Sequence, residues 1–100
     1  MKVRVPDLRK LNMCSYDVAR FAAEWPDGAE VTEANILRAF ELGLDVNWWA
    51  EQVLGLEYCY QRQLLWHVHN YYLRFCKPRP PLREYWHNMA VLICKLLERG

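Results

Sequence analysis

The chain has 100 residues, of which 53% are hydrophobic and 25% are charged, and its formal net charge is +1. This length provides one modest hydrophobic core, so we expect a single domain over residues 1–100 rather than a disordered chain. No apolar run approaches the roughly 18 residues of a membrane-spanning helix. The N-terminal residues lack the apolar core of a secretory signal, and the four irregularly spaced cysteines then favour reduced thiols. We therefore expect a cytoplasmic protein without a membrane partner.

The small net charge hides an uneven distribution along the chain. Residues 1–23 carry a net charge of +3, residues 24–57 of −7 and residues 58–100 of +5. Two interpretations follow. Either the acidic and basic segments neutralise each other across the fold, or the acidic segment forms a negative surface that attracts a positively charged partner.

The first helix signals enclose residues 14–25, with Ser15 as the expected N-cap and the Pro26-Asp27-Gly28 turn as the end. The next helix is expected to begin after the N-cap Thr32. Gly43 then supplies the left-handed position that commonly ends a helix.

Another helix is expected to begin after the N-cap Asp45 and to end or kink at Gly55. From there no helix breaker occurs before Pro78, which predicts one long helix. Pro81 suits the first turn of a last helix, and no segment alternates with the period of a strand. The sequence therefore predicts an all-α fold, a compact bundle of about five helices. The last helix has one apolar stripe, Leu82, Tyr85, Trp86, Met89, Leu92, Ile93 and Leu96.

The long helix has apolar residues on two sides. We expect the broader arc to be buried, and we leave open whether its own chain or a partner covers the narrower strip. The broader arc consists of Tyr60, Leu64, Leu65, Val68, Tyr71, Tyr72 and Phe75. The narrower strip consists of Cys59, Trp66 and Leu73.

Catalytic and metal-binding patterns are missing. His67 and His69 are two residues apart, so on a helix they point about 200° away from each other and cannot bind one metal. No C-x-x-C or H-x-x-x-H pair completes a zinc site. The only serine and threonine, Ser15 and Thr32, are explained as helix caps. We therefore expect no enzyme activity, no metal and no cofactor.

Four basic residues, Arg74, Lys77, Arg79 and Arg83, surround a proline-rich loop. They could neutralise a few phosphates while neighbouring aromatic rings stack on bases. Alternatively, Arg74 and Lys77 interact with the negative end of the long helix and the loop is simply exposed. We favour the second interpretation, so direct nucleic-acid binding is not expected.

The capped hairpin DGAEVTEANILRAFELGLDVNWWAEQVL, residues 27–54, resembles helical hairpins of short phage and mobile-element proteins. In length and in its lack of enzyme motifs, the chain is similar to the helical anti-CRISPR proteins that block type I surveillance complexes. This resemblance implies a small phage-encoded inhibitor that acts in the host cytosol on surfaces needed for DNA binding. No family site maps onto individual residues of this chain.

A complex that handles nucleic acid has lysine- and arginine-lined channels, into which an acidic helical hairpin with rigid aromatic anchors could dock. Two alternatives stay open: a nucleic-acid-binding protein that uses the Arg74–Arg83 loop, and a homo-oligomeric regulatory module that pairs through the Trp66 strip. We expect a monomer or a weak homodimer. The expected partner-binding residues are Asp27, Glu30, Glu33, Glu41, Asp45 and Trp48.

Overall fold

The computed structural model describes residues 1–75 and 81–99, which form six helices and two very short strands. The predicted all-α class is confirmed, with one helix more than the five expected. In chain order the elements are β1 (Lys2–Val3), α1 (Val5–Lys10), α2 (Ser15–Glu24), β2 (Ala29–Glu30), α3 (Glu33–Glu41), α4 (Val46–Leu54), α5 (Leu56–Phe75) and α6 (Leu82–Arg99).

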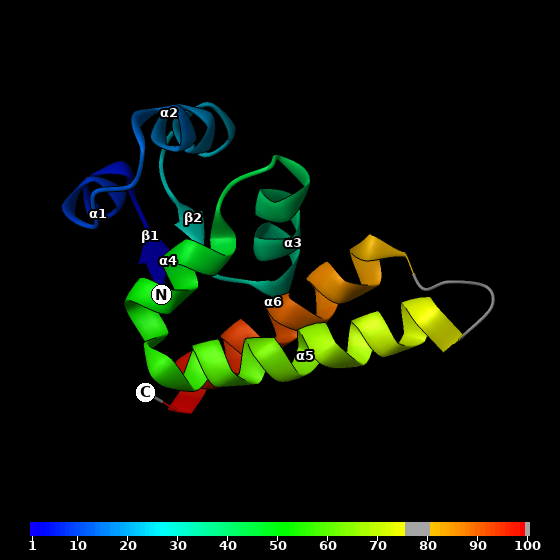
Figure 1. Ribbon diagram of the computed structural model, residues 1–100. Helices are drawn as coiled ribbons and strands as arrows, with labels where there is room; N and C mark the ends of the chain where they lie inside the picture. The colour runs from blue at the N-terminus through cyan, green and yellow to red at the C-terminus, as the bar shows by residue number, and fades with distance from the viewer. Residues whose placement is uncertain (76–80, 100) are drawn as a thin grey trace.

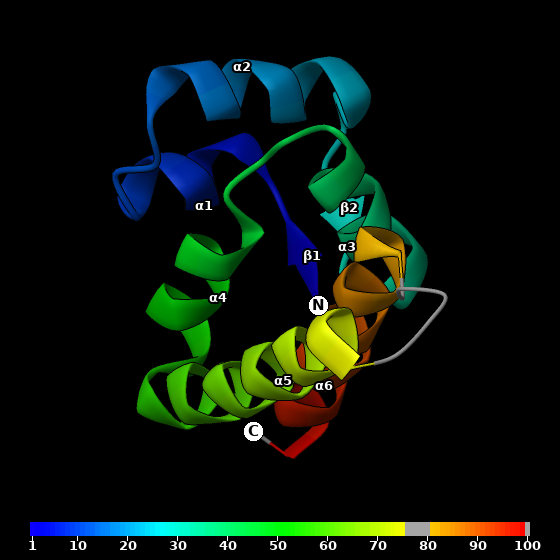
Figure 2. The same ribbon diagram turned by 45° about the vertical axis from the view of Figure 1, so that its right-hand side comes forward.

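The two longest helices, α5 and α6, run antiparallel as a hairpin (Figure 1). Helix α3 packs on α6, and α4 contacts both α5 and α6. The other elements, α1, α2 and the two strands, lie on the side of α3 and α4 that faces away from α5 (Figures 1 and 2). The hairpin therefore forms one side of the molecule, and the C-terminal half of α5 extends beyond α4 (Figure 1). Among the described residues, no helix is both long and apolar enough to cross a membrane.

The elements that the sequence pattern did not predict all lie near the N-terminus. Strands β1 and β2 pair antiparallel, with Lys2 opposite Glu30 and Val3 opposite Ala29. Two residues are too few to show a period-two pattern. Helix α1 has only six residues, and the Asp7 carboxylate accepts a hydrogen bond from the Arg4 backbone N–H at 2.8 Å at its start. Such short elements are set by local hydrogen bonds rather than by an apolar periodicity.

The predicted caps are confirmed for α3 and α4. Thr32 Oγ1 accepts a hydrogen bond from the Asn35 backbone N–H at 3.1 Å, and Asp45 Oδ1 accepts one from Trp48 N–H at 3.1 Å. The prediction for α2 is wrong, because Cys14 occupies the N-cap position with extended backbone and Ser15 is the first helical residue. Cys14 makes no side-chain capping hydrogen bond, so α2 begins without one.

The two glycines predicted to end helices both have positive φ angles, 78° at Gly43 and 73° at Gly55. At Gly55 this conformation ends α4 and lets α5 begin at the next residue in a new direction. The glycine therefore sets the angle at which α5 meets α4 and α6.

Helix α6 supplies the centre of the core. Tyr85, Met89, Ile93 and Leu96 are buried as the apolar stripe predicts, whereas Leu82 at the start of the helix is half exposed. Met89 and Ile93 have no exposed surface, because α3 packs on α6 from one direction and α5 from another. This helix is thus the element on which the others assemble.

Truncating the centre of α6 tests this packing. Ile93→Ala is expected to lower the free energy of unfolding by about 2–5 kcal/mol, because it leaves a cavity between packed helices. Leu82→Ala removes a half-exposed leucine from the same helix and is expected to cost less than about 1 kcal/mol. Urea unfolding followed by circular dichroism measures both, and equal losses would contradict the assignment of the core.

Candidate interaction surface

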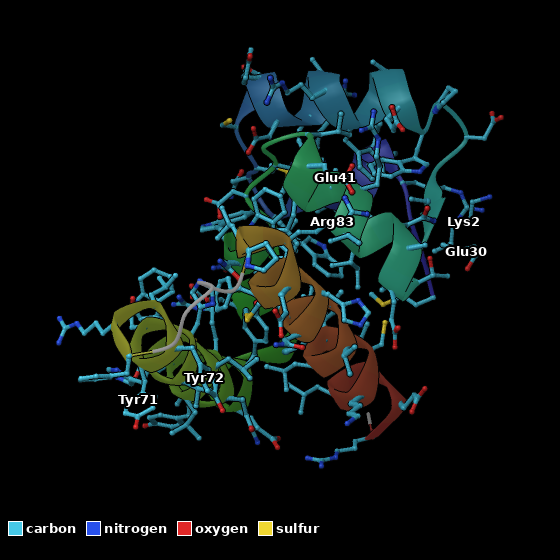
Figure 3. The ribbon with its side chains drawn as sticks, turned by 90° about the vertical axis from the view of Figure 1, so that its right-hand side faces the viewer. Lys2, Glu30, Glu41, Tyr71, Tyr72 and Arg83 are labelled. Carbon is cyan, nitrogen blue, oxygen red and sulfur yellow. The ribbon has the colours of Figure 1, made fainter. Side chains whose placement is uncertain are left out.

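A continuous row of large apolar side chains on α5 is exposed to solvent. Their exposed fractions range from 46% to 71%. Apart from the adjacent Tyr71 and Tyr72, successive members are three or four residues apart, which places them along one side of the helix. Figure 3 shows two of them, Tyr71 and Tyr72, on the side of α5 that faces away from α3. We call this row the α5 face. It consists of Leu56, Tyr60, Leu64, Val68, Tyr71, Tyr72 and Phe75.

The expectation that the broader apolar arc of this helix is buried is therefore wrong. Of its seven residues only Leu65 is half buried, and the other six belong to the exposed α5 face. The buried side of α5 instead carries Tyr58 and His69, with Leu65 and Leu73 at its margins.

Two polar contacts with α4 hold this other side inward. The Tyr58 hydroxyl donates a hydrogen bond to Asn47 Oδ1 at 2.7 Å, and Arg62 donates one to Glu51 Oε1 at 2.8 Å. Tyr58 has no exposed surface, and burial raises its pKa well above the ordinary tyrosine value. These contacts fix the rotation of α5 about its own axis, so the α5 face points outward.

The narrower strip is covered in part by its own chain. The Trp66 ring meets the edge of the Tyr85 ring at 5.5 Å between centroids, and the His69 ring lies 5.1 Å from the same tyrosine. Trp66 keeps 44% of its surface exposed, and Leu73 is half buried. The strip therefore belongs to the α5–α6 contact, with Trp66 at its outer edge.

The aromatic rings of the α5 face contact one another near the C-terminal end of the helix. The Tyr71 ring centroid lies 4.9 Å from that of Phe75 and 5.9 Å from that of Tyr72. Mutual contact restricts the rotamers of these side chains, which lowers the entropy that they lose when a partner binds. Rigid aromatic side chains of this kind are typical anchors of protein interfaces.

The α5 face continues into a groove between α5 and α6. Leu64 and Val68 line the groove from α5, and Val91 and Leu92 line it from α6, with Lys95 beside them. Its volume is about 430 Å³. The apolar surface available to a partner therefore extends from α5 onto the neighbouring wall of α6.

A second apolar cavity, of about 70 Å³, lies among the N-terminal elements, with Val3, Phe21 and Ile36 in its lining. The polar residues at its margin are engaged locally: the Asn35 side chain donates to the Glu30 carbonyl at 2.9 Å, and Asp45 caps α4. This cavity belongs to the core and places no reactive group against a bound molecule.

Most of the acidic segment is neutralised within the molecule. Arg38 pairs with Glu24 at 2.9 Å, which lowers the pKa of that carboxyl. The acidic and basic segments also meet, because Arg62 pairs with Glu51 at 2.8 Å and Arg99 pairs with Glu57 at 3.0 Å. These pairs favour the interpretation that the two segments neutralise each other.

Several predicted partner-binding residues already have roles in the fold. Glu41 lies 2.8 Å from Arg83 of α6 (Figure 3) and 3.7 Å from Arg38. Asp45 caps α4, and Trp48 is half buried against the core. The structure thus does not leave these three side chains free on an acidic surface.

The remaining three acidic residues, Asp27, Glu30 and Glu33, are exposed between the end of α2 and the start of α3. Glu30 lies opposite Lys2 across the two strands, and its carboxylate is 4.0 Å from the N-terminal amine. Among the described residues, neither Asp27 nor Glu33 forms an ion pair. Within the described part of the chain, the unpaired negative charge of the hairpin is therefore concentrated in this segment.

The basic loop is described only at its two ends. Arg74 is exposed in the last turn of α5, and Arg83 is occupied by its ion pair with Glu41. Lys77 and Arg79 lie outside the described residues. In residues 1–75 and 81–99, no three His, Cys, Asp or Glu side chains come together as a metal site requires.

Comparison with known proteins gives no relative to which this surface can be compared. No family model matches the chain, and neither the curated proteins nor the solved structures include a significant match.

The contacts that orient α5 can be tested through Tyr58. The unfolded chain ionises this tyrosine near pH 10, whereas burial keeps the folded form protonated, so the free energy of unfolding falls as the pH rises above 10. Tyr58→Phe is expected to cost about 1 kcal/mol at neutral pH, because Asn47 loses its donor. The variant should also lose less stability than the natural chain as the pH rises. Part of the loss should remain, because burial raises the pKa of Tyr85 as well. Urea unfolding at several pH values measures both effects, and an unchanged pH dependence would contradict the burial of this hydroxyl.

Proposed function

We propose that the protein is a small, non-enzymatic interaction protein that binds another protein chain through the α5 face. The observation that carries this proposal is the exposure of seven large apolar side chains along one side of a single helix. Four of them are aromatic, and each aromatic side chain has roughly 150–250 Å² of surface. At the observed exposures, the four alone present about 400–500 Å² of mostly apolar surface. The largest apolar patch on a monomeric protein is typically about 300–600 Å² and often functional, and the three aliphatic side chains of the α5 face enlarge this one further.

The position of these side chains on the fold also favours an interface. They lie on a regular helix that hydrogen bonds and core packing hold in place, so a partner meets a rigid surface. The groove beside Leu64 and Val68 adds apolar surface from α6. Apolar residues in a groove rimmed by polar groups such as Lys95 and Asn88 have the composition that protein interfaces favour.

A double variant tests the α5 face. Leu64→Glu with Tyr71→Glu places two charges on the surface, and each charge would be desolvated on binding. Because both side chains are exposed, the melting temperature should change little. A tagged full-length chain is used to capture proteins from the lysate of the producing cells, which are quantified by mass spectrometry, and its own self-association is measured. If the α5 face binds another protein, the captured amount of that protein should fall at least tenfold. If it binds a second copy of the chain, self-association should weaken at least tenfold.

Tyr16→Glu is the matched control, because Tyr16 is an exposed tyrosine on α2 rather than on α5. It should bind like the natural chain. If the double variant captures the same proteins in the same amounts and associates with itself to the same extent, the α5 face is not the interaction surface.

A second candidate is an inhibitor of a nucleic-acid-handling complex, as the resemblance to type I anti-CRISPR proteins implies. The observation that favours it is the exposed acidic segment with Asp27 and Glu33, which form no ion pair among the described residues. Such carboxylates would meet the basic channel through which the complex binds DNA, and attraction between opposite charges would accelerate association. Glu41 and Asp45 would contribute by supporting the hairpin rather than by direct contact.

This second candidate predicts a measurable loss of DNA binding. The natural chain should reduce target-DNA binding by a purified type I surveillance complex in a gel-shift assay. The variant with Asp27→Lys, Glu30→Lys and Glu33→Lys should be at least tenfold less effective, because like charges would then repel. Glu84→Lys with Glu98→Lys on α6 is the control, since these exposed residues lie on another element. Unchanged DNA binding with an excess of the natural chain would contradict this role.

A further inference from the structure

We propose that the occupant of the α5 face is a second copy of this chain, whose α5 packs antiparallel against the first. This inference rests on the proposed function, because it names the partner of the same surface. Three observations carry it: the ends of the helix have opposite charge, its flank is uncharged, and the exposed apolar area is that of a dimer interface.

The charges at the two ends of α5 complement each other only in the antiparallel direction. Glu57 lies in the first turn, where it pairs with Arg99 of its own chain and stays more than half exposed, and Arg74 lies exposed in the last turn. When two copies of α5 pack antiparallel about a twofold axis at the middle of the helix, Glu57 of each copy reaches the level of Arg74 of the other. A parallel pair would bring like charges together at each end. The opposed helix dipoles favour the antiparallel arrangement as well.

The same symmetry places apolar groups together along the pair. Tyr60 and Tyr71 are equally far from the centre of α5, so each tyrosine of one copy faces the other tyrosine of its partner. Leu64 lies beside the axis and meets its own counterpart. Isologous interfaces require this kind of self-complementary surface, and edge contacts between tyrosine rings are favourable.

The side chains that flank the α5 face carry little charge. Gln63 and Asn70 are uncharged amides, and neither an acidic residue nor a lysine or arginine stands between them on this flank. The middle of the α5 face therefore offers a strongly charged partner no opposite charge, and the exposed charges of the helix lie at its two ends. A second copy would meet no net repulsion.

The exposed area is sufficient for a dimer of moderate stability. A standard interface buries about 800 Å² per partner. The aromatic side chains of the α5 face supply about half of this area, and Leu56, Leu64 and Val68 supply much of the rest. The groove that continues from Leu64 and Val68 onto Val91 of α6 lets a partner helix lie partly against α6 as well.

Sedimentation of the natural full chain over a concentration series tests the inference. We expect a reversible change from the 12.0 kDa monomer to a species of twice this mass. The Leu64→Glu variant should weaken the association at least tenfold, and Tyr16→Glu should leave it unchanged. A single monomeric species at concentrations up to about 100 μM, well above a micromolar dissociation constant, would overturn the inference.

A charge exchange tests the antiparallel arrangement. Glu57→Arg, made together with Arg99→Glu so that the ion pair within the chain is kept in reverse, and Arg74→Glu should each weaken the dimer severalfold, because like charges then meet at both ends. The double variant, which carries both of these changes, should recover most of the affinity. If the double variant is as weak as the single variants, the antiparallel pairing is wrong.

These outcomes separate this inference from the proposed function. A natural chain that stays monomeric, but captures another protein that Leu64→Glu with Tyr71→Glu fails to capture, overturns the homodimer and leaves the α5 face as an interaction surface. If the double variant changes neither self-association nor capture, both proposals fail.

Discussion

The rotation of α5 about its own axis determines which of its side chains are buried and which form the exposed α5 face. That rotation is set by the Tyr58–Asn47 hydrogen bond and the Arg62–Glu51 ion pair, both of which connect α5 to α4. A half-buried ion pair adds little net stability, because desolvation offsets most of the attraction, but breaking it leaves a charge in an unfavourable place. The two contacts therefore add little to the stability of the fold, but they disfavour other rotations of α5 against α4.

The distribution of charge along the chain has a structural role that a net charge of +1 conceals. Ion pairs join α2 to α3 through Glu24 and Arg38, α3 to α6 through Glu41 and Arg83, and α5 to α6 through Glu57 and Arg99. Each pair is exposed to solvent and contributes little by itself. Together they connect elements that are distant in sequence and reduce the negative field of residues 24–57. An interaction that depends on that field is left with the short segment around Asp27 and Glu33.

The sequence predicts this fold best where one residue determines a local structure. Thr32, Asp45, Gly43 and Gly55 act through their own side chains or backbone, so their effects can be derived without knowledge of the neighbours. The prediction for α5 was wrong because the helix has apolar residues on two sides, and a hydrophobic pattern does not say which side the rest of the chain covers. Six of the seven residues of the α5 face, all except Leu56, therefore fall in the arc that the sequence pattern assigns to the core. A usable signal was the polar pair on the other side, Tyr58 and Arg62, each eleven residues after a possible partner, Asn47 and Glu51.

The length of α5 explains why a small domain exposes so many aromatic rings. A helix of 20 residues is about 30 Å long, but α4 covers only its first half, and the C-terminal half extends along α6 alone (Figure 1). Tyr71, Tyr72 and Phe75 lie in this second half, where the described part of the chain offers no further element to cover them. A chain of this size buries a smaller share of its surface than a larger domain does. Within the described residues these rings therefore stay in contact with water, and the proposed packing of a second α5 against them would remove them from it.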